Sequence, residues 1–92
     1  MKPELHELAQ GFSLLSSSTR LSILKRCAKG PKNVTALCKA LKVKQPTLSH
    51  HISLLRLGRL LNSVRRGKSV LYATDEANLK ALAAAVPRLL LK

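Results

Sequence analysis

The fold of this chain is decided by one stretch, which reads Lys44-Gln45-Pro46-Thr47-Leu48-Ser49-His50-His51-Ile52-Ser53-Leu54-Leu55-Arg56-Leu57-Gly58. Leu48, Ile52 and Leu55 recur at the spacing of one helical face, and we expect this face to be buried. Pro46 lies at or near the first helical position, and Gly58 follows the last turn, where we expect it to close the helix in the left-handed conformation. Polar side chains lie on the remaining surface, namely Gln45, Thr47, Ser49, His50, Ser53 and Arg56. The pattern predicts a helix that a scaffold holds on one side and presents to a polar partner on the other.

The net charge indicates what that partner is. The 92 residues carry a formal net charge of +13. The segment from Leu8 to Thr74 contains thirteen Lys or Arg residues and no Asp or Glu. Such a segment repels itself unless a polyanion neutralises it, and nucleic acid is the usual polyanion. A surface that is charged only for solubility normally mixes both signs, so the charge favours a nucleic-acid partner.

Length and composition argue against several other classes of protein. The 92 residues predict a single domain, 1–92, that is too short to bury a large core alone, so we expect a core shared in an oligomer. No apolar run approaches the roughly 20 residues of a membrane span, and the N-terminus does not resemble a signal peptide, so we expect a cytoplasmic protein without a membrane partner. The acid-free body offers no carboxylate pair and no glycine-rich phosphate loop. We therefore predict that the protein is not an enzyme and needs no cofactor.

Three helices are predicted before the quoted stretch, from apolar periodicity, and they cover about residues 3–15, 19–29 and 33–41. Ser17 or Ser18 is expected to cap the second helix, and Asn33 the third. Gly30 and Pro31 end the second helix. Lys42-Val43-Lys44 is then a tight turn, so the third helix and the Pro46 helix form a helix-turn-helix whose second member enters a DNA major groove.

The period changes to that of strands after Gly58. Two short runs, residues 59–64 and 69–74, flank Arg65-Arg66-Gly67-Lys68, which supplies a glycine for a tight hairpin and three charges at its tip. A basic hairpin after a recognition helix is a wing that contacts phosphates or the adjacent minor groove. We expect Tyr72 to anchor the returning strand on the core, because a chain with 2% aromatic residues lacks the stacking platform of single-strand binders. Duplex DNA is therefore favoured.

The last predicted helix covers residues 75–91 and is apolar nearly all round. Such a helix is buried on more than one side. In so short a chain we expect the second side to be covered by another subunit, with the helix of residues 3–15 joining the interface. The predicted fold is mainly α with a small β-hairpin: a winged helix-turn-helix of order α-α-α-α-β-β-α, dimerised through its first and last helices.

Three sets of residues resemble the arsenic-repressor (ArsR/SmtB) family of winged helix-turn-helix regulators. They are Ser18-Thr19-Arg20-Leu21 with Ile23-Leu24, Lys44-Gln45-Pro46-Thr47-Leu48-Ser49-His50-His51-Ile52 with Leu54-Leu55, and Arg66-Gly67-Lys68 with Tyr72. The resemblance covers about Ser16 to Thr74. It implies a homodimeric repressor that releases its operator when a metal ion, metalloid or oxidant changes the geometry of the dimer. It also implies that Gln45, Thr47, Ser49 and His50 contact base edges and phosphates, and that His51 is tied into the scaffold.

The chain departs from this family at the sites that sense metals. Where metalloid-binding members carry Cys-Val-Cys and then a third Cys, the chain reads Asn33-Val34-Thr35 and then Cys38. The segment Leu79 to Lys92 contains no His, Cys or acid that could match the zinc site of other members. Soft metals need several thiolates or imidazoles, and adjacent histidines on a helix point about 100° apart. We therefore predict no metal site, and the residues identify no effector.

Cys27 and Cys38 are open to two interpretations. Both fall on apolar helical faces, which favours small core residues, since free Cys is among the most buried residue types. The alternative is a redox switch through a disulfide or a thiol pair, which requires the two α-carbons to lie within about 7 Å.

The function predicted from the sequence is a sequence-specific double-stranded DNA-binding transcriptional regulator, a repressor that binds a palindromic operator as a dimer. Bases are expected to be read by Gln45, Thr47, Ser49 and His50. Backbone contacts are expected from Arg20, Lys39, Lys42, Lys44, Arg65, Arg66 and Lys68. The alternative is an architectural DNA-coating protein with little sequence preference, for which the extreme charge is the main argument.

Overall fold

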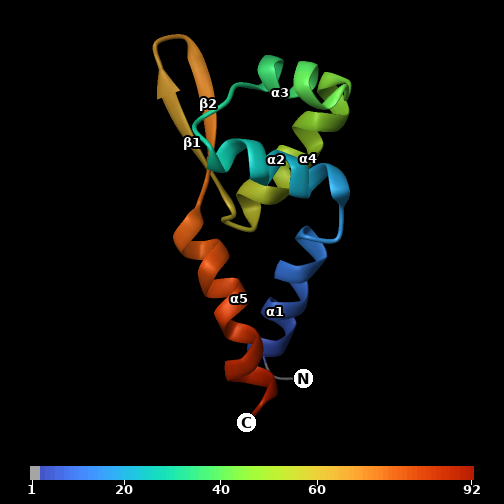
Figure 1. Ribbon diagram of the computed structural model, residues 1–92, viewed down its shortest axis with the longest axis vertical. Coiled ribbons are helices and arrows are strands. Elements are labelled where there is room, and N and C mark those ends of the chain that lie inside the picture. The colour runs from blue at the N-terminus through green and yellow to red at the C-terminus, as the bar shows by residue number, and fades with distance from the viewer. Residues whose placement is uncertain (1–2) are drawn as a thin grey trace.

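The elements of the computed structural model, which describes residues 3–92, follow the predicted order α-α-α-α-β-β-α. They are α1 (Pro3–Leu14), α2 (Ser18–Ala28), α3 (Val34–Leu41), α4 (Gln45–Leu57), β1 (Leu61–Arg66), β2 (Ser69–Thr74) and α5 (Glu76–Leu90). Figure 1 shows α2, α3, α4 and the hairpin gathered at one end, while α1 and α5 extend away from them as two legs. The molecule is accordingly elongated, with extents of 46 × 23 × 19 Å.

Side-chain caps fix the start of three helices. Ser17 accepts a hydrogen bond from the backbone N–H of Arg20, Asn33 accepts one from Ala36, and Asp75 accepts one from Asn78. Each cap satisfies a backbone donor that the first helical turn leaves unpaired. Ser17, and not Ser18, is therefore the cap of α2.

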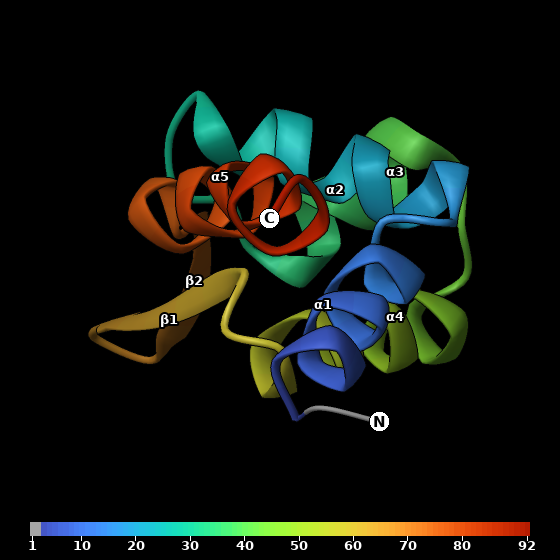
Figure 2. The same cartoon turned by 90° about the horizontal axis from the view of Figure 1, so that it is seen from below.

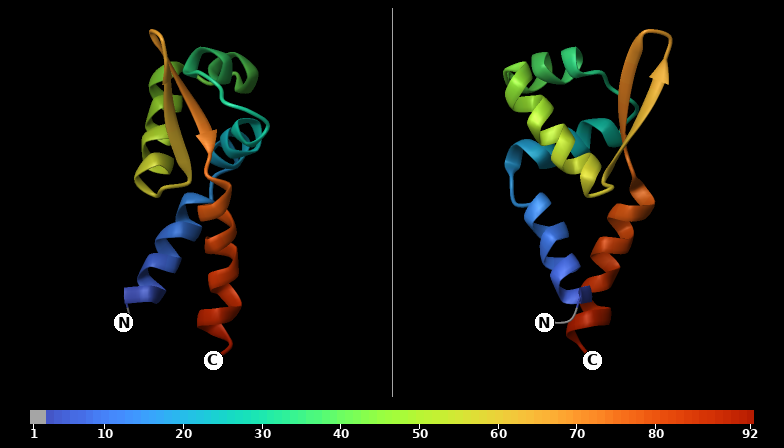
Figure 3. Two further views of the ribbon diagram at one scale, coloured as in Figure 1. Left: turned by 90° about the vertical axis from the view of Figure 1, so that its left-hand side faces the viewer. Right: turned by 180° about the vertical axis from the view of Figure 1, so that it is seen from behind.

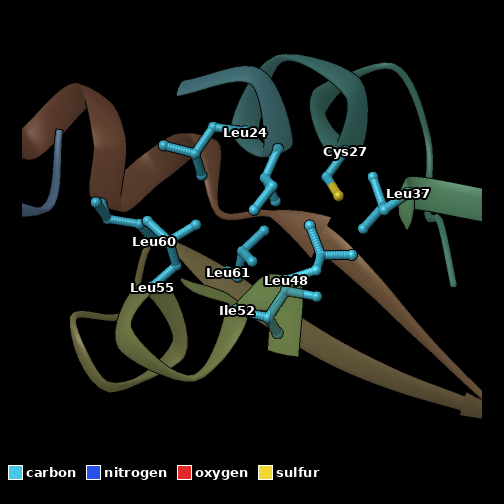
Figure 4. Close-up of a cluster of buried hydrophobic side chains, with 9 residues drawn as sticks. Leu24, Cys27, Leu37, Leu48, Ile52, Leu55, Leu60 and Leu61 are labelled. Atoms are coloured by element: carbon cyan, nitrogen blue, oxygen red, sulfur yellow. The ribbon is translucent and has the colours of Figure 1, made fainter. Parts of the chain in front are cut away.

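The core lies between α2, α3, α4 and the start of β1. Its buried members are Ile23, Leu24, Cys27, Leu37, Leu48, Ile52, Leu55, Leu60 and Leu61, and Figure 4 shows these side chains converging from the surrounding elements. The predicted buried face of α4 is confirmed, because Leu48 and Leu55 are 0% exposed and Ile52 is 3% exposed. Full burial of one such side chain stabilises the fold by about 1.5–3 kcal/mol. This face therefore seats α4 firmly on the scaffold.

The hairpin is antiparallel, and its register runs from Leu61 opposite Thr74 to Arg66 opposite Ser69. The predicted first strand, residues 59–64, is displaced by two residues, so the loop is Gly67 and Lys68 instead of the predicted four residues. Gly67 has φ 61°, while Lys68 is not among the residues with positive φ. A glycine at the first of two loop positions is the arrangement of a type II′ hairpin turn, whose twist matches that of the strands.

The end of α4 explains that displacement. The prediction that Gly58 closes the helix in the left-handed conformation is wrong: Gly58 has φ −80°, and Arg59 has φ 61°. Leu60 N–H donates to Leu55 O at 2.9 Å, which closes the helix one residue later and delays the strand. Gly58 serves a different purpose, since a Cβ at this position would collide with the Leu14 side chain of α1.

The two legs pack side by side. A Cβ at Gly11 of α1 would meet the Leu82 side chain of α5, so the absence of a side chain lets the helices approach closely. Figure 3 shows the legs in two further orientations, and in Figure 2, which views the molecule from the end of the legs, the hairpin projects sideways. Among residues 3–92 no helix is long and apolar enough to cross a membrane.

Candidate nucleic-acid interface

The turn between α3 and α4 sets the orientation of the helix-turn-helix. α3 ends at Leu41, and Lys42 adopts the left-handed conformation with φ 55°. The backbone N–H of Val43 donates to Cys38 O at 3.2 Å, which closes α3. Lys44 is extended and leads into α4, where Pro46 lies in the first turn and has no N–H to leave unpaired. The short turn predicted from the sequence is confirmed.

The outer face of α4 carries the predicted base-reading residues. Gln45, Thr47 and His50 are exposed, and Ser49 is half-buried. Ser53 and Arg56 are also exposed and continue the same face toward the end of the helix. These side chains offer hydroxyl, amide and imidazole groups, which are the donors and acceptors that recognise base edges. The structure thus brings the four predicted residues together on the first two turns of one helix.

The wing presents the predicted basic tip. Arg65, Arg66 and Lys68 are exposed, as is every residue from Asn62 to Val70. Figure 1 shows the hairpin extending past α2 and α3 to the end of the molecule opposite the legs. Nothing among residues 3–92 covers these charges, so they are available to a polyanion.

The base of the wing is held by contacts that the sequence did not reveal. Lys32 forms a bridge to Tyr72, with Lys32 N–H donating to Tyr72 O at 3.0 Å and Tyr72 N–H donating to Lys32 O at 2.8 Å. Thr74 Oγ1 donates to Leu24 O of α2 at 2.7 Å. The sequence carries no signal for either contact, because each joins residues that lie far apart in the chain. The hairpin is therefore stabilised by a third extended segment as well as by the helices.

Tyr72 packs against the core, as predicted. The guanidinium carbon of Arg56 lies 6.0 Å from the centre of the Tyr72 ring, at the outer limit of a cation–π contact. The contact links the last turn of α4 to the wing. Arg56 therefore belongs to the candidate interface. The sequence analysis placed it on the polar face of the helix but predicted no contact for it.

Lys39, Lys42 and Lys44 are exposed around the turn of the helix-turn-helix. Arg20 does not belong to this group of exposed side chains. Its Nε donates to Leu14 O at 2.7 Å, its Nη2 donates to Ser13 O at 3.1 Å, and its Nη1 lies 3.1 Å from His51 Nδ1. The structure therefore turns this guanidinium toward the protein, unlike the other residues predicted to contact the DNA backbone.

His50 and His51 occupy different environments on α4. His50 is exposed and His51 is half-buried, with ring centres 6.0 Å apart. Burial lowers the pKa of His51 below its usual value, and the charges of Arg20 and His50 lower it further. His51 is thus tied into the scaffold. No group of three or more His, Cys, Asp or Glu side chains within the described residues could hold a metal ion.

Cys27 and Cys38 are both free thiols. Cys27 is 2% exposed and belongs to the core, whereas Cys38 is half-buried. Burial raises the pKa of the Cys27 thiol to about 11, against a smaller lowering by the charge of Lys32. Cys27 thus has the environment of a small core residue, and the redox alternative stays a prediction.

The legs expose apolar side chains at the other end of the molecule. Phe12 of α1 is 40% exposed, Leu90 of α5 is 58% exposed, and Leu91 is 81% exposed. A groove between the legs is lined by apolar side chains from both helices and from α4, among them Leu8, Leu14, Leu57, Leu82 and Leu89, and also by charged side chains of α1 and α5. This surface is distinct from the basic one around α4 and the wing.

Comparison with known proteins places these features in a family. The family described as "Helix-turn-helix domain" matches residues 15–64. The transcriptional regulator Rv2034 of Mycobacterium tuberculosis is 33% identical over 73 residues, which cover 79% of this chain and 68% of that protein. An ArsR-like transcriptional regulator from a Rhodococcus species superposes with a TM-score of 0.85 at 28% identity, over 92% of this chain and 80% of that chain.

A third relative is described with its assembly. It is the homodimeric winged helix-turn-helix DNA-binding domain Mb0332 of Mycobacterium bovis, a possible ArsR-family regulator. It superposes with a TM-score of 0.74 at 30% identity, over 96% of this chain and 84% of that chain. The match to this chain spans only part of each of six relatives, between 53% and 73% of its length.

Proposed function

The chain belongs to the arsenic-repressor (ArsR/SmtB) family of winged helix-turn-helix transcriptional regulators, and on this premise we propose that it is a repressor that binds a palindromic operator in duplex DNA as a homodimer. One observation carries the proposal. The polar face of α4 is presented beside a basic wing, on a body that contains no acid from Leu8 to Thr74. A helix of this kind enters the major groove while basic residues around it bind the phosphates.

Two groups of residues make different contacts with the DNA. Gln45, Thr47, Ser49 and His50 contact base edges in the major groove, and their exposure on the first turns of α4 supports this role. Phosphates are bound by Lys39, Lys42, Lys44, Arg65, Arg66 and Lys68, all of them exposed. The phosphate contacts supply affinity that weakens with salt, and the base contacts supply preference for one sequence.

The legs form the dimer interface in this proposal. Exposed apolar side chains on α1 and α5 support it, as does the homodimeric Mb0332 domain, whose fold matches over most of this chain. Two subunits related by a two-fold axis place their α4 helices in successive major grooves, about 34 Å apart. We further propose that residues 1–92 act as one DNA-binding domain in the cytoplasm, without a catalytic role.

Selection of binding sites from random duplex DNA at physiological salt tests the proposal most directly. A palindromic consensus with two half-sites about one helical turn apart is the expected result, because each half-site is read by one α4. Selection that returns no consensus would count against a sequence-specific repressor.

An architectural DNA-coating protein is the second candidate, and the net charge of +13 favours it. The double variant Ser49→Ala with His50→Ala separates the two candidates when its affinity is measured on the operator and on random DNA of the same length. A specific regulator loses about 1–3 kcal/mol of discrimination for each good base contact removed. Arg66→Ala is the control, because loss of a phosphate contact weakens both complexes alike. Equal losses on both DNAs for the double variant would favour the architectural protein.

A further inference from the structure

Arg20 of α2 lies where three helices meet. It donates to two carbonyl groups at the C-terminal end of α1, from Nε to Leu14 O at 2.7 Å and from Nη2 to Ser13 O at 3.1 Å. Its Nη1 lies 3.1 Å from Nδ1 of His51, in the middle of α4. A guanidinium can only donate, so His51 Nδ1 accepts and the ring hydrogen resides on Nε2. One side chain therefore joins the end of α1 to α4.

A second contact joins the same two helices. Gly58, directly after α4, lies against the Leu14 side chain of α1 so closely that a Cβ at this position would have to displace Leu14 Cδ1. His51 and Gly58 are seven residues apart, which corresponds to about 10 Å along a helix. One contact would act as a pivot between α1 and α4, whereas two contacts at this separation fix the angle between them.

We propose that Arg20 is a positioning residue for DNA recognition, which fixes the angle between α4 and the dimerisation helix α1 instead of binding a phosphate. This role rests on the proposed function, because α1 affects DNA binding only if it belongs to the dimer interface. The two α4 helices of a dimer must enter grooves about 34 Å apart. A rotation of α4 relative to α1 changes that separation, and a sequence-specific complex tolerates the change less than a non-specific one.

Lysine cannot replace Arg20 in this role, although it carries the same charge. The planar fork of arginine directs separate N–H groups at three acceptors, whereas an ammonium is a single point charge on a flexible stem. Lysine would leave part of the α1 end or His51 without its partner. If Arg20 bound only a phosphate, lysine would serve nearly as well.

The test compares Arg20→Lys with the wild type on the selected operator and on a random duplex of the same length. The expected result is a rise of about tenfold in Kd for the operator, the size expected from one lost hydrogen bond to a charged group. Kd for random DNA and its dependence on salt are expected to stay unchanged, because the charge is kept. Arg26→Lys is the matched control, since Arg26 is an exposed arginine of the same helix, and it is expected to leave both Kd values unchanged.

Substitutions of His51 test the contact from its other side. His51→Asn keeps a neutral acceptor at the position of Nδ1 for Arg20 and is expected to retain the preference for the operator. His51→Leu removes the acceptor and is expected to lose that preference as Arg20→Lys does. The double variant Arg20→Lys with His51→Leu is expected to lose no more than the worse single variant, because both break the same link between α1 and α4.

Three results would overturn the role of Arg20. They are unchanged affinities for both DNAs in Arg20→Lys, equal losses on both DNAs in the same variant, and additive losses in the double variant. Circular dichroism and sedimentation establish that each variant is folded and has the wild-type assembly. If Arg20→Lys does not fold, the pair His51→Asn and His51→Leu decides alone. If the proposed function itself is wrong, the result is different, because the wild type will then not distinguish operator from random DNA.

Discussion

At the scale of the residue, His51 is held neutral by its surroundings. Burial, Arg20 and His50 all lower its pKa below the usual value near 6.5. The folded state therefore binds a proton less readily than the unfolded state does. The contribution of neutral His51 to the free energy of unfolding is complete above pH 6.5. This contribution is lost as the pH falls below 6.5 and through the lower pKa that His51 has in the folded state.

The prediction is that the free energy of unfolding falls below pH 6.5 more steeply in the wild type than in His51→Gln, which cannot take up a proton. Urea unfolding between pH 5 and 8 at one protein concentration measures the difference. Ser53→Ala is the control, because Ser53 is an exposed residue of the same helix that takes up no proton, and it should follow the wild-type curve. Identical curves for His51→Gln and the wild type would contradict the prediction.

The two cysteines are predicted to differ in reactivity. The Cys27 thiol is buried with its pKa raised to about 11, so at pH 8 it is protonated and shielded. A thiolate-selective reagent should therefore modify Cys38 first, and Cys27 only as fast as the fold opens. Variant Cys38→Ser should show the slow phase alone, and denaturant should make both thiols fast. Equal rates in the folded protein would restore the redox pair as the better interpretation.

At the scale of the element, the tip of the wing depends on the backbone conformation of Gly67. Gly67 has φ 61° at the first position of a two-residue turn, where a side chain is strained. Every residue from Asn62 to Val70 is exposed, so the helices do little to hold the tip of the hairpin. The turn therefore decides whether Arg65, Arg66 and Lys68 are presented in one arrangement.

Gly67→Ala is predicted to loosen the tip of the wing at a local cost of about 1–2 kcal/mol. Amide hydrogen exchange should become faster in β1 and β2, while exchange in the core helices stays unchanged, and affinity for DNA should fall. Lys68→Ala keeps the turn and removes a charge, so it should lower the dependence of affinity on salt without faster exchange. Unchanged exchange in the Gly67→Ala hairpin would show that the glycine is not needed.

At the scale of the whole molecule, the structure separates a basic end from an apolar one. The recognition helix and the wing lie at the first, and the legs α1 and α5 at the second (Figure 1). The core between them includes nine buried residues, few for a chain that must hold two such surfaces. Association through the legs would add apolar burial that the single chain lacks.

Leu90→Glu is predicted to weaken the dimer, since it places a charge on an apolar side chain that is 58% exposed in the single chain. Sedimentation should then show a monomer at micromolar concentration, and affinity for the full operator should fall far more than affinity for one half-site. Val70→Glu on the wing is the control for assembly and should remain dimeric. A dimeric Leu90→Glu protein would place the interface elsewhere.

The sequence by itself determined the order of elements, the buried face of α4, the tight turn before it and the basic hairpin after it. These features depend on periodicity, capping and charge, which act over a few neighbouring residues, and so they can be read from the chain. Local patterns also placed Gln45, Thr47, Ser49 and His50 on one surface of a helix.

Other features depend on contacts between residues that are distant in the sequence, and only the tertiary structure decided these. It joined the Arg20 guanidinium to α1 and α4, paired Lys32 with Tyr72, and assigned Gly58 to a close approach of Leu14 instead of a left-handed cap. It also moved the first strand by two residues, because Arg59 and not Gly58 adopts the left-handed conformation after α4. The physical reason is that a guanidinium, a backbone bridge and a missing side chain acquire their roles from neighbours that the fold brings together, and the spacing of residues along the chain carries no record of those neighbours.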